Sequence, residues 1–252
     1  MLLPSGFVKR PPSVLLIFFA MAALLSCKKD VPATVNFDYG YFPSSIGKYI
    51  VYDVDSVYRT SFDYKLDTVR YQLKEVIDSI YTDNTGRPTM KINRYRKLFS
   101  SSVPYSAMPW TLLNIWSANR TLTDAERVED NVRYVKLVFP VVLYQTWNGN
   151  AFNTQGLLNY YYSSIDQTAQ IEGANLDSVL TVIQIADSNN ITEQFATEKY
   201  AKNIGLIYRH VINVTDNSKA IYGFPFNSNN NNSNKDSAVG IVSYTETMNS
   251  HN

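Results

Sequence analysis

The sequence is short of the residues that build disulfides, zinc sites and histidine-dependent active sites. Its 252 residues include one cysteine, Cys27, and two histidines, His210 and His251. A single cysteine excludes an internal disulfide, so stability must come from an apolar core. With so few thiol and imidazole groups, zinc sites and serine or cysteine hydrolases are disfavoured. We predict no metal site and no cofactor.

An excess of charge of one sign is missing as well. The chain has 23 Lys and Arg side chains against 22 Asp and Glu, and no basic stripe with interleaved aromatic residues. A chain so close to neutral has no strong field to attract polyanions. Glycine-rich phosphate loops are also absent from the sequence. These absences predict that nucleic acid is not a partner.

Helical periodicity is missing after residue 26, and no segment repeats at a fixed period. Instead, apolar and polar residues alternate in short stretches; Ile50, Tyr52 and Val54, for example, share one face of an extended chain. Turn signals such as residues 83–88 separate these stretches. We predict an all-β fold over residues 37–252. It would be a single antiparallel curved sheet, barrel or sandwich of nine to eleven strands, lipocalin-like in general architecture, with little helix.

Some segments need a choice between structures. Residues 121–130 have helix-forming composition, but their small apolar face and flanking strand patterns favour a turn or strand edge. For residues 193–202, a short helix closed by Gly205 is the alternative to extended chain. In residues 64–81 the apolar positions change parity between Leu73 and Ile80, which suggests a β-bulge. The asparagine-rich residues 227–237 have nothing to bury and predict a disordered loop.

The longest apolar run lies near the start of the chain. Residues 14–26 follow the basic pair Lys9 and Arg10 and end at Cys27. The run is shorter than the roughly 20 residues that span a bilayer, which indicates a secretory signal. The alternatives are an ordinary cleaved signal that ends near a cysteine, or a short anchor that is never cut.

Residues 24–27, Leu-Leu-Ser-Cys, resemble the lipobox of bacterial lipoproteins. The resemblance implies cleavage before Cys27, a diacylglyceryl group on its thiol and acylation, for instance with palmitate, of the new amino terminus. The organisation is then a signal peptide at residues 1–26, a lipidated Cys27 with a short tether at residues 27–36, and one β-rich domain. Because two or three acyl chains anchor durably, we expect a membrane-bound protein of the bacterial cell envelope, in the outer membrane, on its periplasmic or surface face.

Three further segments carry a second resemblance. Residues 41–56, residues 136–140 with 147–150, and residues 200–208 are similar to recurring segments of uncharacterised Bacteroidota cell-envelope lipoproteins. None of them is a catalytic motif. The resemblance therefore implies a compartment and an all-β domain, and it implies no reaction.

Paired carboxylates are the one catalytic chemistry that the composition leaves open. Asp53 and Asp55 share a strand face, where they could hold a hard cation such as calcium or act as the acid and base of a glycosidase. A solvated strand face explains them more simply. A polar turn is likewise the simpler interpretation of Glu126, Arg127, Glu129 and Asp130. We assign no catalytic residue.

His210 shares strand parity with Leu206 and Tyr208, so we expect it to point toward the apolar face. A histidine there is more simply a core or rim residue with one hydrogen bond than a base or a metal ligand.

Aromatic residues are abundant: 19 Tyr, 12 Phe and 3 Trp. They suit strands, where they fill a core, and they also form platforms for glycans or apolar ligands. If a ligand site exists, the candidate residues are Trp110, Trp116, Trp147, Tyr160, Tyr161 and Tyr162.

Three functions are compatible with this sequence. The favoured one is a non-catalytic, lipid-anchored β-domain that binds an apolar or glycan ligand or serves as an accessory subunit of an envelope complex. The second is a structural or protein-interaction lipoprotein without a ligand, and the third is a carboxylate-dependent glycan hydrolase. An internal cavity would favour the first, a filled interior the second, and converging carboxylates with one raised pKa the third.

Overall fold

The computed structural model describes residues 36–59, 66–98, 102–188, 193–214 and 241–252. Within these residues it contains twelve strands and two 3-10 helices of three residues each, so the predicted all-β fold is confirmed, with more strands than the nine to eleven expected. The predicted lipidation site, most of the tether and the asparagine-rich loop lie outside the described residues. The elements are η1 (Tyr39–Tyr41), β1 (Tyr49–Arg59), β2 (Leu66–Thr82), β3 (Pro88–Leu98), η2 (Tyr105–Ala107), β4 (Thr111–Arg120), β5 (Asp124–Glu129), β6 (Val132–Val138), β7 (Thr146–Asn148), β8 (Asn159–Ile171), β9 (Ala174–Ser188), β10 (Glu193–Ala201), β11 (Gly205–Val214) and β12 (Ile241–His251).

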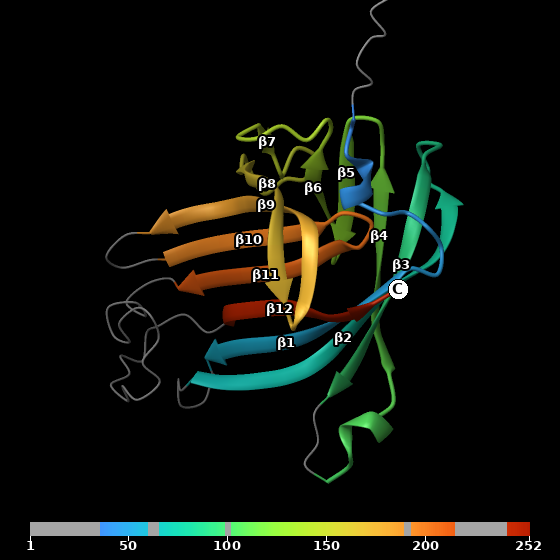
Figure 1. The fold of residues 1–252 in the computed structure, drawn as a ribbon, viewed down its shortest axis with the longest axis vertical. Helices are drawn as coiled ribbons and strands as arrows, with labels where there is room; N and C mark the ends of the chain where they lie inside the picture. The colour runs from blue at the N-terminus through green and yellow to red at the C-terminus, as the bar shows by residue number, and fades with distance from the viewer. Residues whose placement is uncertain (1–35, 60–65, 99–101, 189–192, 215–240) are drawn as a thin grey trace, which may run out of the picture. The chain divides into compact units, whose positions relative to one another are not determined.

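The sheet is an antiparallel meander that curls back on itself (Figure 1). Nearly every strand pairs with its neighbours in the chain, and β1 also pairs with β12, from Ile50–His251 to Tyr58–Ile241. The two edges of the sheet are therefore β6 and β7, which follow each other in sequence. The result is one nearly closed, barrel-like sheet, an arrangement that leaves few strand edges open.

We call the meeting of the two edge strands the seam, residues 132–138 and 146–149. The amide of Val135 donates to the carbonyl of Gly149 across it, at 2.8 Å. The indole N–H of Trp147 donates to the Val135 carbonyl at 2.9 Å. A Cβ at Gly149 would lie 2.3 Å from the Tyr160 ring, so only glycine fits this position.

The structure decides the segments for which the sequence left a choice. Residues 121–130 contain strand β5, which agrees with the strand edge among the preferred alternatives of turn and strand edge. Residues 193–201 form strand β10, so the helix alternative is wrong. The pairing of β2 with β3 shifts register between Ile77 and Ser79, which confirms the predicted bulge. The predicted turn before Pro88 is present, with Asp83 accepting hydrogen bonds from the amides of Thr85 and Arg87.

Apolar side chains form three buried clusters in the described residues, the smallest of which is Tyr52, Val54 and Leu73 on β1 and β2. The largest cluster runs from η1 through β3, β4 and the seam to β9 and β10. A smaller one forms where the outer end of the β8–β9 hairpin packs on β10, β11 and β12, through residues that include Ile171, Val179, Ile207 and Met248.

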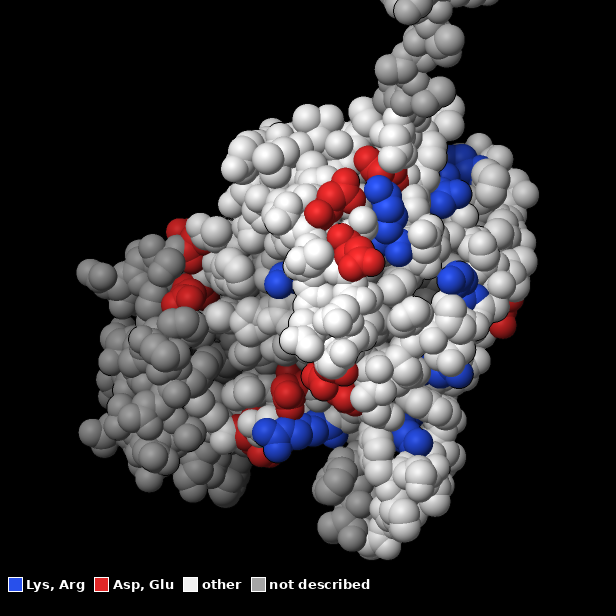
Figure 2. All heavy atoms as spheres, viewed as in Figure 1, with Lys and Arg blue, Asp and Glu red and all other residues white. Residues whose placement is uncertain are grey.

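The surface of the domain carries both signs of charge. Figure 2 shows acidic and basic side chains interspersed over the visible face, as expected from the nearly equal numbers of each. In the described part of the chain, no helix has the length and apolar character to cross a membrane.

Candidate functional site

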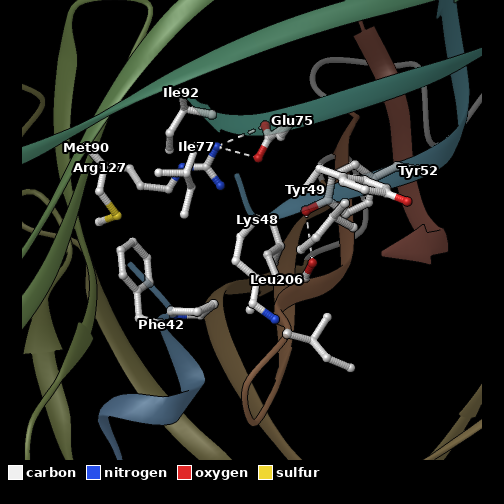
Figure 3. A pocket seen from close by; sticks show the side chains of 14 residues that line it. Phe42, Lys48, Tyr49, Tyr52, Glu75, Ile77, Met90, Ile92, Arg127 and Leu206 are labelled. Atoms are coloured by element: carbon white, nitrogen blue, oxygen red, sulfur yellow. Dashed lines mark hydrogen bonds and ion pairs between the residues drawn. The ribbon is translucent and has the colours of Figure 1, made fainter. Parts of the chain in front are cut away.

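A pocket opens into the interior of the barrel between β1, β2, β3 and the start of β11 (Figure 3). Its empty volume, which includes open solvent at the mouth, is about 510 Å³. Most of its walls are apolar. The lining includes Phe42, Ile77, Met90, Ile92, Leu206 and the charged pair Glu75 and Arg127.

The charged pair forms the floor of this pocket. Arg127 Nη2 lies 2.9 Å from each carboxylate oxygen of Glu75, and both side chains are more than nine-tenths buried. Figure 3 shows Arg127 and Glu75 facing each other at one end of the pocket, with Ile77 and Ile92 beside them. Burying two charges is tolerated because they are paired and hydrogen-bonded. A pocket with apolar walls and a charged floor is suited to an amphipathic molecule, whose polar group would lie at the floor and whose apolar part would lie along the walls.

The floor belongs to a larger set of buried charges that we call the ionic cluster. It contains four acids and four bases from seven strands, all at most slightly exposed. Its members are Glu75, Arg94, Arg127, Glu129, Lys136, Glu198, Arg209 and Glu246.

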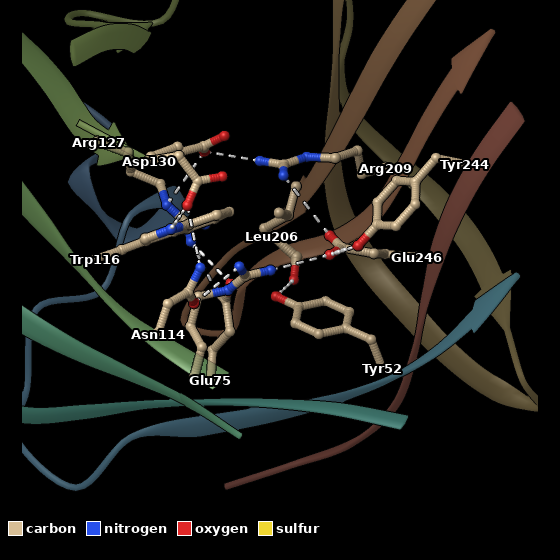
Figure 4. Close-up of polar contacts among 12 residues, drawn as sticks. Tyr52, Glu75, Asn114, Trp116, Arg127, Asp130, Leu206, Arg209, Tyr244 and Glu246 are labelled. Atoms are coloured by element: carbon tan, nitrogen blue, oxygen red, sulfur yellow. Dashed lines mark hydrogen bonds and ion pairs between the residues drawn. The ribbon is translucent and has the colours of Figure 1, made fainter. Parts of the chain in front are cut away.

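Six members of the ionic cluster form a ring of alternating sign (Figure 4). Starting at Glu75, the ring passes to Arg94 at 2.8 Å and on to Glu246 at 3.6 Å. From Glu246 it continues to Arg209 at 3.9 Å and to Glu129 at 2.9 Å. Arg127 closes it, 3.5 Å from Glu129 and 2.9 Å from Glu75. The ring connects β2, β3 and β5 with β11 and β12 through the interior.

Glu198 and Lys136 extend this ring toward the seam. Glu198 is fully buried and lies 2.8 Å from both Lys136 and Arg209. Lys136 also lies 3.1 Å from Glu129, and the Tyr200 hydroxyl donates to Glu198 at 2.5 Å. Glu198 and Lys136 therefore each have at least two partners, which are oppositely charged side chains or hydrogen-bond donors, as buried charges require.

Proton affinities differ among the acids. Burial alone would raise the pKa of Glu75, but the guanidinium groups of Arg127 and Arg94 hold it below its ordinary value. Burial likewise opposes ionisation of Glu198, and Lys136 and Arg209 lower its pKa to about 2. In contrast, burial raises the pKa of Glu246, and the nearby charge of Glu75 adds to that effect. Glu246 is thus the member of the cluster that binds a proton most readily.

The predicted aromatic residues fall into separate places. Trp147 lies against Tyr160 and Tyr162, with ring centroids 6.0 and 4.6 Å apart, and all three are buried in the core at the seam. Trp116 lies under two guanidinium groups of the ionic cluster. Its ring centroid is 3.4 Å from Cζ of Arg94 and 5.0 Å from Cζ of Arg127. None of the six candidates lines the pocket floored by Glu75 and Arg127.

The other two predicted aromatic residues lie apart from these groups. Trp110 is half-buried, with the ammonium of Lys97 5.3 Å from its ring. Tyr161 is also half-buried and pairs in the sheet with Thr146 and Ile183. A ligand-binding role for the aromatic set stays a prediction.

One sequence interpretation needs correction. Glu126, Arg127 and Glu129 form strand β5 rather than a polar turn, and Glu126 and Arg127 are almost fully buried. His210 is half-buried and shares one hydrogen bond with Thr245 at 2.8 Å, which agrees with the expected rim histidine, and its neighbour Arg209 lies in the ionic cluster.

A bulge changes which residues share a strand face with His210. The pairing of β10 with β11 shifts between Lys199 and Tyr200, so that Ile207 has no partner and Leu206 pairs with Tyr200. Leu206 is therefore not on the side that its spacing from His210 indicates.

Asp53 and Asp55 do lie on a solvated part of the sheet. Asp55 pairs with Arg70 at 2.8 Å, with 59% and 78% of the two side chains exposed, and Asp53 accepts from Gln72 and Asn249. Over the described ranges, no group of three or more histidine, cysteine, aspartate or glutamate residues is placed to hold a metal ion.

The sequence contains one signal that could have indicated the ionic cluster. Several of its members share parity with apolar residues inside a strand, as Glu246 does with Tyr244 and Met248, and Lys136 with Val138. A charge on an apolar face requires a buried partner. Which partner it has depends on register across the barrel, and no single segment of sequence contains that information.

No protein-family model matches the chain, and no curated protein matches its sequence. Among solved structures, the chain is similar to a Bacteroides fragilis protein inferred to be exported and described as having a YmcC-like fold, at 12% identity and a TM-score of 0.40. It is also similar to an inferred lipoprotein from Parabacteroides distasonis, at 10% identity and a TM-score of 0.33. Each alignment covers 84% of this chain and 98% of the other.

Proposed function

We propose that this chain is a non-catalytic binding protein of the bacterial cell envelope, lipid-anchored through Cys27, that holds an apolar or amphipathic ligand inside its β-domain. The observation that carries the proposal is the pocket with apolar walls and a charged floor. The membrane anchor is supported by the sequence, through the apolar run of residues 14–26 and the lipobox-like residues 24–27, and we propose the outer membrane as its location.

A purely structural role would suit a filled interior better. The pocket leaves open space beside Ile77, Ile92 and Leu206, whose apolar surfaces would otherwise gain from close packing. A fold that maintains such a space at the end of a buried ionic cluster favours a ligand.

A glycan hydrolase is the second candidate, because Glu75 and Glu246 approach the same arginine and the pKa of Glu246 is raised. A general acid must reach the bond that it protonates. Glu246 is 1% exposed and does not line the pocket, and Glu75 is paired with two arginines. We therefore favour binding over catalysis.

The test uses the full chain with two matched tryptophan variants. Ile77→Trp narrows the pocket from a half-buried wall position, and Leu122→Trp makes the same change at a site that is 77% exposed. Each protein is incubated with envelope extract and examined by native mass spectrometry. We expect a stoichiometric small molecule on the wild type and Leu122→Trp, but not on Ile77→Trp. A ligand-free wild type, or a ligand retained by Ile77→Trp, would contradict the proposal.

A further inference from the structure

Arg127 has hydrogen-bonding capacity that the protein does not use. Its Nη2 donates to both oxygens of Glu75, whereas its Nε makes no hydrogen bond and lies 3.5 Å from Glu129. For Nη1, the described residues offer no hydrogen-bond partner. The side chain is 4% exposed, and its Nε is shielded from bulk water. In Figure 3 one guanidinium nitrogen without a dashed contact is turned toward the pocket.

Two other polar side chains of the pocket have partners. The Tyr52 hydroxyl donates to the Leu206 carbonyl at 2.9 Å. At the mouth, Lys48 Nζ donates to the backbone carbonyls of Asn203 and Asn252. Arg127 is consequently the donor that the floor offers to a ligand, and a guanidinium prefers a planar oxyanion such as a carboxylate.

The charge of the ionic cluster permits one added anion. With all groups ionised it contains four negative and four positive side chains. Glu246 accepts from the Tyr244 hydroxyl through one oxygen, while its other oxygen has no hydrogen-bond partner and lies 3.9 Å from Arg209. A proton on Glu246 would leave one positive charge in excess, and the carboxylate of a ligand would neutralise it.

Building on the proposed function, we propose that the ligand is a single-chain amphiphile with a carboxylate head, in the manner of a fatty acid. The carboxylate hydrogen-bonds to Arg127 Nη1 at the floor. The hydrocarbon chain runs along Ile77, Met90 and Phe42 toward the mouth. A cationic head would leave the Arg127 donor unsatisfied in a buried site, and a neutral hydroxyl would accept a weaker hydrogen bond from it than a carboxylate does.

Arg94 provides a matched control for Arg127. Both guanidinium groups pair with Glu75, both lie over Trp116, and both are buried, at 6% and 4% exposure. Only Arg127 lines the pocket. The variants Arg127→Gln and Arg94→Gln thus remove comparable charges from the same cluster and differ in their access to a ligand.

The experiment measures binding of dodecanoate, dodecanol and dodecyltrimethylammonium to the full chain in amphipol by isothermal titration calorimetry. We expect wild type and Arg94→Gln to bind dodecanoate at least about tenfold more tightly than dodecanol, and Arg127→Gln to lose this preference. Circular dichroism verifies that each variant is folded. Equal binding of dodecanoate and dodecanol by wild type, or a preference that survives in Arg127→Gln, would overturn the inference.

A second measurement needs no variant. NMR follows the ¹³C chemical shift of the labelled carboxyl carbon of bound dodecanoate as the pH is varied. Contact with Arg127 should lower the pKa of the bound carboxyl group below that of the free acid. An unchanged or raised value would contradict the contact. If wild type binds dodecanol as well as dodecanoate and Ile77→Trp binds neither, the carboxylate inference fails while the proposed function stands. If the pocket binds only a glycan from the extract, the carboxylate amphiphile and the apolar or amphipathic ligand of the proposed function are both refuted.

Discussion

Replacing Glu198 with glutamine keeps the size of the side chain and removes its charge from the centre of the ionic cluster. The wild-type carboxylate is fully buried between Lys136 and Arg209, 2.8 Å from each. After the substitution these two cations remain buried, with their remaining partner being Glu129 and, for Arg209, the more distant Glu246. We therefore expect the variant to be markedly less stable.

The loss of stability on Glu198→Gln can be estimated in two ways, from the lowered pKa of Glu198 and from the typical cost of breaking a buried ion pair. Lys136 and Arg209 lower the pKa of Glu198 from 4.5 to about 2, a difference that corresponds to about 3 kcal/mol of stabilisation of the charged form. Removing one partner of a buried ion pair typically costs about 3–5 kcal/mol. Both routes predict a loss of about 3 kcal/mol at pH 7.

The assay is urea denaturation of the full chain, wild type and Glu198→Gln, followed by circular dichroism from pH 7 downward. Because the pKa of Glu198 is lowered in the folded state, its contribution is complete above its ordinary pKa of 4.5 and disappears as the pH falls toward about 2. The stability gap between the two proteins should therefore narrow as the pH falls, for as long as both remain folded.

The matched control is Asp55→Asn, which breaks the exposed pair with Arg70 and should change the free energy of unfolding by less than about 1 kcal/mol. If Glu198→Gln also lost less than about 1 kcal/mol at pH 7 with an unchanged urea slope, the reasoning would be refuted. The desolvation cost of the cluster would then equal its Coulombic gain.

Three other predictions concern the seam, the anchor and β11. Gly149→Ala should cost about 1–3 kcal/mol in urea denaturation, since its Cβ would overlap the Tyr160 ring; an unchanged midpoint would show that the seam can open locally. Cys27→Ser should move the protein out of the membrane fraction, and mass spectrometry of the wild-type amino-terminal peptide should show an acylated Cys27. Burial lowers the pKa of His210, so stability that is complete above pH 6.5 should decline below it, and His210→Gln should lessen that decline. An imidazole pKa at or above 6.5 by NMR would contradict the last point.

Local structure was largely predictable because strand and turn signals are local. The turn before Pro88 and the bulge after Ile77 follow from a few neighbouring residues, and both are present. The β10 segment was harder: its charged residues resemble a helix, yet Glu198 and Tyr200 point inward and meet partners from other strands. Tertiary contacts override propensity there.

The candidate site was predictable only in part, because alternation in sequence assigns polar residues to solvent. Arg209 and Glu246 break that rule together, since each lies buried near the other. A single sequence shows neither the register that pairs them nor the bulge that brings Leu206 to the pocket. Ring size favours the tryptophans as ligand-binding candidates, whereas Arg127, in a segment whose composition indicates a turn, forms the floor of the pocket.

The pairing of β1 with β12 also bears on how the domain folds. Most other neighbours in the sheet are joined by hairpins, whose ends meet after short loop closures, but Ile50 and His251 are separated by almost the whole domain. Bringing together residues so far apart in sequence costs chain entropy before the contacts contribute any stabilising energy, and this slows folding. We expect this ladder to form after the rate-limiting barrier, so that substitutions such as Val54→Ala and Met248→Ala mainly speed unfolding, with φ-values near zero. High φ-values at both positions would mean instead that the ends of the domain meet early and that the hairpins assemble on them.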